Sequence, residues 1–167
     1  MKKILILLFL TGLIGACGTP AFFLRDVNKN LTLSMAVNDF EHMKSQYAFW
    51  GGIILSGKNL KDTTEFEVLA YPLNNYGEPL LDNHSYGRFV VVNQGYLELG
   101  EYAQDRRVTV VGELTATRKG KVGDSNYTYP VLNARQLKLW IDEPEVIYQD
   151  PNFGFHFGIG IYHHHRH

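Results

Sequence analysis

The sequence predicts an all-β protein, and three observations lead to this fold class. Apolar and polar residues alternate with a period of two in several short runs, and Gly, Pro, Asn or Asp residues flank these runs. Aromatic residues make up 13% of the 167 residues, with ten Tyr and ten Phe, as suits strands with half-buried faces. Beyond the first sixteen residues, no segment carries the long apolar stripe of an amphipathic helix.

The first sixteen residues match a secretory signal. Two lysines precede an apolar run over residues 4–10, and the small residues Gly15 and Ala16 end the segment. The apolar part is too short to cross about 30 Å of hydrocarbon as a helix. We therefore expect residues 1–16 to be a signal peptide and not a transmembrane anchor.

The only cysteine of the chain, Cys17, directly follows Ile14, Gly15 and Ala16. This pattern resembles the bacterial lipobox, which implies cleavage between Ala16 and Cys17 and a covalent diacylglycerol and N-acyl chain on Cys17. Two or three acyl chains anchor a protein stably, whereas one chain binds a membrane only marginally. By resemblance to the lipoprotein sorting rule, Gly18 favours the outer membrane, since Asp is the inner-membrane signal. The alternative is an incidental cysteine after an ordinary signal peptide.

Four segments are expected in the chain. After the signal peptide, residues 17–30 form a lipidated tether without periodicity, residues 31–145 form the β domain, and residues 146–167 form a tail rich in glycine, aromatic residues and histidine. The domain begins with a mixed stretch, residues 31–46, that could form one or two helical turns. Losing the two lysines of the signal changes the formal charge from −1 to −3, so nucleic acid is not an expected partner.

The β domain contains five runs with strand signals. The pair Gly51-Gly52 in the first run indicates a bulge or a tight bend. Residues 73–86 and 118–128 are expected to be loops, the second basic and rich in glycine. This order and spacing favour a small OB-like Greek-key β-barrel of about five to six strands, with a small sandwich as the alternative. The five runs are residues 48–57, 64–73, 87–92, 107–117 and 129–140.

Longer motifs within these runs resemble a known family. They read FWGGIILSGKN, TTEFEVLAYPLNNYGEP, YGRFVVVNQGYLELGEY and RRVTVVGELTATRKGKVGDSNYTYPVLNARQLKLW, and they cover residues 47–140. Together with the lipobox, they resemble the Slp family of Gram-negative outer-membrane lipoproteins, which is associated with starvation and stress. The resemblance implies a periplasm-facing, lipid-anchored domain with a structural or stress-related role, other envelope proteins as partners, and no known catalytic residues. Within it, Trp140 is expected to close the core.

Two patterns bear on catalysis, and neither predicts an enzyme. Gly123-Asp124-Ser125 could mark a serine hydrolase, but it falls between two strand runs with no helix after it, which favours a hairpin loop. Glu65, Glu67 and Glu113 stand singly in strand runs, and we expect them to be exposed on solvated faces. The protein is therefore predicted to be non-enzymatic and to need no cofactor beyond its acyl chains.

The last residues offer an alternative function. His163, His164, His165 and His167 form a short cluster that could hold a divalent metal loosely; the alternatives are a tag remnant and a tail without a role. The protein would then be a metal-ion or small-ligand binding module that uses this cluster or a face of the barrel. Residues 151–162 alternate between apolar residues and Gly or His, as in a strand that adds to a partner or meets lipid, or they form an unstructured tail.

Overall fold

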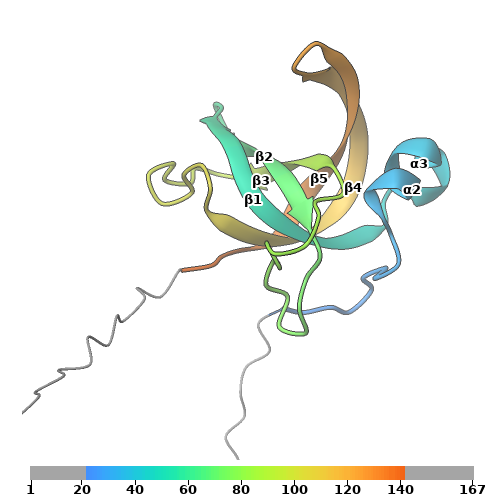
Figure 1. The fold of residues 1–167 in the computed structure, drawn as a ribbon, viewed down its shortest axis with the longest axis horizontal. Coiled ribbons are helices and arrows are strands. Elements are labelled where there is room, and N and C mark those ends of the chain that lie inside the picture. Colours follow the sequence, from blue (N-terminus) through green and yellow to red (C-terminus); the bar gives the residue numbers. More distant parts are fainter. Residues whose placement is uncertain (1–21, 142–167) are drawn as a thin grey trace, which may run out of the picture.

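Five strands form a closed barrel in the computed structural model, which describes residues 22–141 (Figure 1). Around the barrel the order is β1-β2-β3-β5-β4, and β4 closes onto β1. Neighbouring strands are antiparallel except for the parallel pair β3 and β5. This confirms the predicted OB-like barrel, with five strands. The strands are β1 (Tyr47–Asn59), β2 (Thr63–Tyr71), β3 (Arg88–Gln94), β4 (Arg107–Val122) and β5 (Ser125–Leu139).

Two short helices precede the barrel, as the mixed stretch before it suggested. They are α2 (Leu33–Asn38) and α3 (Phe40–Met43), and they lie beside the barrel in Figure 1. Thr32 caps α2, because its side-chain oxygen accepts a hydrogen bond from the Met35 amide at 3.2 Å. Leu33 and Ala36 are buried and belong to the barrel's hydrophobic core. The helices thus cover apolar core residues that the strands alone would leave open.

The interior of the barrel is filled by alternate residues of the strands. Trp50, which is 3% exposed, packs edge to face on Phe89 and donates its indole N–H to the Leu31 carbonyl at 2.7 Å. The expectation that Trp140 closes the core is wrong. Its ring is only partly buried and lies under the Lys138 ammonium, with its indole N–H donated to Thr109. The strand residues of the main core are Ala48, Trp50, Ile54, Phe66, Val68, Ala70, Phe89, Val91, Val108, Val110, Leu114 and Leu132.

The Gly51-Gly52 pair marks a close approach of backbones. A Cβ at Gly52 would lie 1.8 Å from the Leu69 carbonyl oxygen of β2, so no other residue fits there without moving a strand. The register shift in the β1–β2 pairing occurs a little later, between Ile54 and Ser56. The expected irregularity of β1 is therefore present, while the glycines themselves allow the strands to meet.

The segment 118–128, expected to be a loop, is mostly strand, and that prediction is wrong. β4 continues to Val122, β5 starts at Ser125, and only Gly123 and Asp124 form the turn. Gly123 has a φ of +58°, the conformation that a two-residue hairpin turn requires. Backbone pairing, which does not depend on polarity, carries the two strands past the barrel as a curved hairpin (Figure 1). We call residues 116–130 the arm.

Residues 22–30, expected to be part of a free tether, pack on the barrel. Phe22 is 8% exposed and contacts the Phe49 ring edge to face at 5.0 Å. Val27 forms an isolated bridge with Tyr47, and the Asn28 amide donates to the Tyr47 carbonyl at 2.9 Å. Apolar burial therefore fixes this segment against the barrel despite its lack of periodicity.

Within residues 22–141, no helix has the length and hydrophobicity to cross a membrane.

Candidate functional site: a charged groove under the arm

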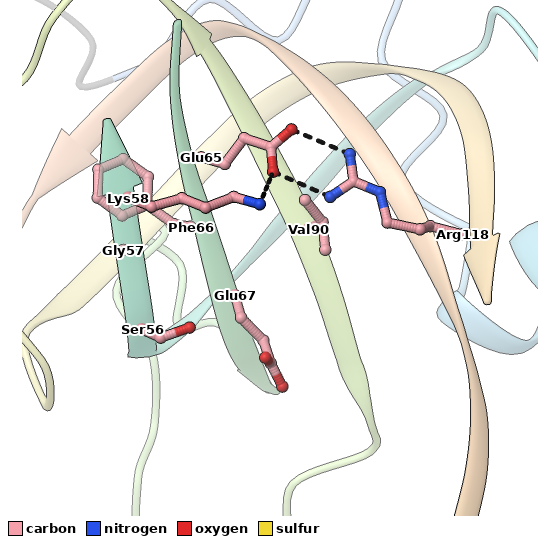
Figure 2. Close-up of a pocket in the computed structure, with 8 residues that line it drawn as sticks. All are labelled: Ser56, Gly57, Lys58, Glu65, Phe66, Glu67, Val90 and Arg118. Carbon is pink, nitrogen blue, oxygen red and sulfur yellow. Dashed lines mark hydrogen bonds and ion pairs between the residues drawn. The ribbon is translucent and has the colours of Figure 1, made fainter. Parts of the chain in front are cut away.

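A groove of about 360 Å³ lies on the outside of the barrel, between the β1–β2 end and the arm (Figure 2). Four strands line it, with β1, β2 and β3 contributing one wall and β4 contributing Arg118. OB barrels bind their ligands on this side, between the β1–β2 and β4–β5 connections. The lining residues are Ser56, Gly57, Lys58, Glu65, Phe66, Glu67, Val90 and Arg118.

At the centre of this groove, Glu65 binds two cations from different strands. The two guanidinium nitrogens Nη1 and Nη2 of Arg118 donate to Oε2 and Oε1 of Glu65 at 2.9 and 3.0 Å. The Lys58 ammonium lies 3.1 Å from Oε2, as Figure 2 shows. The carboxylate side chain is only 10% exposed, whereas those of Lys58 and Arg118 are 62% and 45% exposed. We call these three residues the Glu65 cluster.

This pairing sets the ionisation of Glu65. The hydrogen bonds from Arg118 lower the pKa of the carboxyl, burial opposes them, and Lys58 lowers it further, to about 2. In turn, the hydrogen bonds to Glu65 raise the pKa of Arg118. A catalytic acid or base needs a pKa near the working pH, so Glu65 is unsuited to proton transfer. Its arrangement suits a structural ion pair that joins the arm to β2.

A second set of contacts joins the arm to the same strands. Arg88 of β3 forms an ion pair with Glu67 at 2.8 Å, and the hydroxyl of Tyr127 accepts a hydrogen bond from the Arg88 amide at 2.8 Å. The Tyr129 hydroxyl donates to the Lys121 carbonyl at 3.1 Å, across the arm. Tyr129 also packs in a small buried cluster with Val90 and Val131. Polar and apolar contacts together hold the arm over β2 and β3.

The prediction that all three carboxylates are exposed is wrong. Glu65 is buried in its cluster, and Glu67 and Glu113 are half-buried. The alternation in β2 did identify Glu65 as a residue of the outer face. It could not show that Arg118, 53 residues later, covers that face, because the arm was expected to be a loop.

The other predicted sites divide into two groups. The Gly123-Asp124-Ser125 tripeptide is the hairpin turn and the first residue of β5, in agreement with the hairpin interpretation. Ala16 and Cys17 lie outside the described residues, and so do His163, His164, His165 and His167. Within residues 22–141, no three His, Cys, Asp or Glu side chains gather in a way that could hold a metal ion.

The chain matches curated relatives over part of its length. It is 37% identical over 91 residues to an uncharacterized protein of Haemophilus influenzae, covering 54% of this chain and 49% of that protein. It is 30% identical over 102 residues to the uncharacterized lipoprotein YeaY of Escherichia coli, covering 61% and 52%. It is 25% identical over 95 residues to the outer membrane protein Slp of E. coli, covering 57% and 50%. The matches thus span about half the length of these relatives.

Among solved structures, a small single-stranded DNA-binding protein from Streptomyces coelicolor is 14% identical, with a TM-score of 0.38. That match covers 59% of this chain and 97% of the other. At the level of families, the model of the outer membrane lipoprotein Slp family matches residues 14–165, which is nearly the whole chain and includes the lipobox. The chain therefore belongs to the outer membrane lipoprotein Slp family.

Proposed function

We propose that the protein is held at the outer membrane by acyl chains on Cys17 and that its barrel is a non-catalytic module of the cell envelope. The observation that carries this proposal is the position of the unique cysteine directly after Ile14, Gly15 and Ala16, at the start of the family match. A triacylated cysteine anchors a domain stably without a spanning segment.

The non-catalytic role is supported by the charged groove. Its most buried carboxylate, Glu65, is already bound by Arg118 and Lys58 and is ionised throughout the physiological pH range. The groove thus binds its own arm at the position where OB barrels hold ligands. The barrel then acts through its shape and surface, facing the periplasm and contacting other envelope proteins, and it supports the envelope under stress.

Fractionation of cells tests the anchor. Cys17→Ala removes the thiol that is acylated, so we expect the protein to leave the outer-membrane fraction and its mass to lack acyl chains. Gly18→Asp is the matched control, because it keeps the thiol and, by the sorting rule, is expected to move the acylated protein to the inner membrane. A Cys17→Ala protein that stays in the outer-membrane fraction would show that another part of the chain is the anchor.

A second candidate function is metal binding by the C-terminal cluster. The observation that favours it is that four of the seven histidines lie in the last five residues. Titration of the full chain with Zn²⁺ or Ni²⁺, beside a chain that lacks residues 163–167, tests it. We expect binding at micromolar metal only with the tail, and equal binding by both chains would remove the tail from consideration.

A further inference from the structure

We propose that one end of the barrel rests on the lipid surface that holds the acyl chains, so that the domain has a fixed orientation on the membrane. This end is formed by Phe23 and the connection between β2 and β3, residues 72–87. The proposal depends on the proposed anchoring of Cys17 and adds the face of the domain that meets the lipid.

The described chain starts at this end of the barrel and is fixed there. Besides the contact with Phe49, Phe22 lies so close to Gly77 that a Cβ on Gly77 would be 2.9 Å from its ring. The Phe23 amide donates to the Gln136 side chain of β5 at 3.0 Å. In Figure 1 the first described residues and the β2–β3 connection lie at the same lower end of the barrel.

The covalent geometry of the chain keeps this end near the anchor. Phe22 lies five positions after Cys17, and a fully extended chain advances at most about 3.6 Å per position, so the reach is at most about 18 Å. The acyl chains enter the hydrocarbon at Cys17. The end of the barrel at Phe22 therefore stays within one leaflet's thickness of the lipid surface.

Apolar side chains on this end stay exposed among the described residues. Five of the nine large hydrophobic residues that are exposed between residues 22 and 141 belong to it. Tyr76 is 78% exposed and Phe23 62% exposed. We call the five residues the anchor-side face, and they are Phe23, Tyr76, Leu80, Leu81 and Tyr86.

The surroundings of this face suit a membrane–water interface. Tyr86 lines a groove of about 690 Å³ whose wall mixes apolar residues such as Phe49 with polar ones such as Lys29, and it donates its hydroxyl to the Tyr71 carbonyl. Lys138 lies over the rings of both Phe22 and Trp140. Tyr, Trp and snorkelling Lys side chains are enriched where hydrocarbon meets water, since each joins an apolar body to a polar end.

The residue Tyr96 provides a matched control at the other end of the barrel. It is 69% exposed and lies just after the last residue of β3, Gln94. The connection between β2 and β3 ends at the first residue of β3, Arg88. Seven residues of strand place the two ends about 20 Å apart. Lipid that meets the anchor-side face is thus out of reach of Tyr96.

The test places one fluorescent probe at either end of the lipidated full chain. Acylation blocks Cys17, the only cysteine, so Tyr76→Cys or Tyr96→Cys introduces the only free thiol. Each variant is labelled with a nitrobenzoxadiazole dye and reconstituted in phosphatidylethanolamine–phosphatidylglycerol vesicles that contain a lipid with a nitroxide quencher near the headgroup. We expect the probe at Tyr76 to be quenched at least about threefold more than the probe at Tyr96, because interfacial residues enter the headgroup region.

Each outcome decides between the two proposals. Equal quenching at the two positions, whether strong or absent, in protein with an acylated Cys17 would overturn the orientation and leave the anchor in place. A mass spectrum without acyl chains on Cys17, in protein that does not sediment with vesicles, would overturn the anchor and with it the orientation. Both variants replace exposed tyrosines, so folding is preserved, and circular dichroism of the labelled proteins checks this.

Discussion

The charged groove and the anchor-side face both lie on the outside of the barrel, but their side chains differ in burial and in partners. In the groove, Glu65 is nearly buried and holds two cations of the same chain. On the anchor-side face, Tyr76 and Phe23 expose most of their surface. The groove is filled by residues of its own fold, whereas lipid is the occupant that we propose for the face. This difference directs the search for an external partner to the face and not to the groove.

The largest loss of stability is expected from a substitution in the loop that carries most of the anchor-side face. Gly77 has a φ of +84°, and a Cβ there would lie 2.7 Å from the Phe49 ring. Gly77→Ala combines backbone strain with a clash, so we expect a loss of about 3 kcal/mol in the free energy of unfolding. Urea denaturation of the purified protein measures it.

Gly95→Ala is the matched control for this substitution. Gly95 has nearly the same φ, +83°, but nothing lies within 4 Å of its would-be Cβ. Only the strain remains, and the expected loss is about 1 kcal/mol. Equal losses for the two variants would show that the packing of Phe22 and Phe49 around Gly77 does not hold the loop.

The next largest loss of stability is expected from a substitution in the charged groove. Glu65→Gln removes the anion that binds Arg118 and Lys58, and we expect a loss of about 2 kcal/mol in the free energy of unfolding. Glu67→Gln is the control, because Glu67 pairs with one cation among residues 22–141, Arg88, accepts a long hydrogen bond from Tyr129 and is more exposed, so its loss is expected to be below about 1 kcal/mol. A larger loss for Glu67→Gln would contradict the central place of the Glu65 cluster.

The pH dependence of stability tests the same cluster by titration. The pKa of Glu65 is about 2 in the folded protein, below its ordinary value of 4.5, so the folded state binds fewer protons than the unfolded state between these values. Its contribution is complete above pH 4.5 and is lost as the pH falls towards 2. We expect unfolding experiments to give a shallower loss of stability for Glu65→Gln in this window. Parallel curves for the two proteins would contradict the lowered pKa.

The smallest effect on stability is expected on the anchor-side face itself. Tyr76 is 78% exposed, so Tyr76→Ser is expected to change the free energy of unfolding by less than about 0.5 kcal/mol. The melting temperature in detergent is the measurement. A marked loss of stability would show that Tyr76 stabilises the fold. It would contradict the contrast between the groove, whose residues hold the fold together, and the anchor-side face, whose residues do not.

The strands of the barrel could be predicted because their signals are local. Alternation in runs such as TEFEV reflects one face on the core and one on the outside, and the sequence displays it within a few residues. The arm was missed for the same reason. Its tip is polar and rich in glycine, and its apolar residues, such as Tyr127 and Tyr129, pack on distant strands, so no local alternation marked the extended pairing of β4 with β5.

The groove and the packed start of the domain could not be predicted. The Glu65–Arg118 pair joins residues 53 positions apart, and Phe22 meets Phe49 and Gly77 only because the barrel brings them together. Nothing in the local pattern distinguishes Glu65 from Glu67, although one is buried between two cations and the other is half-exposed.

The sequence by itself determined the all-β class, the family and the expected position of the acyl anchor, since each depends on residues close together in the chain. The tertiary structure alone decided which carboxylate is buried, where the arm lies and which apolar side chains stay exposed. These properties depend on the closure of β4 onto β1 and of β5 onto β3, which brings distant residues into contact. Ionisation and exposure follow from those contacts and not from residue type.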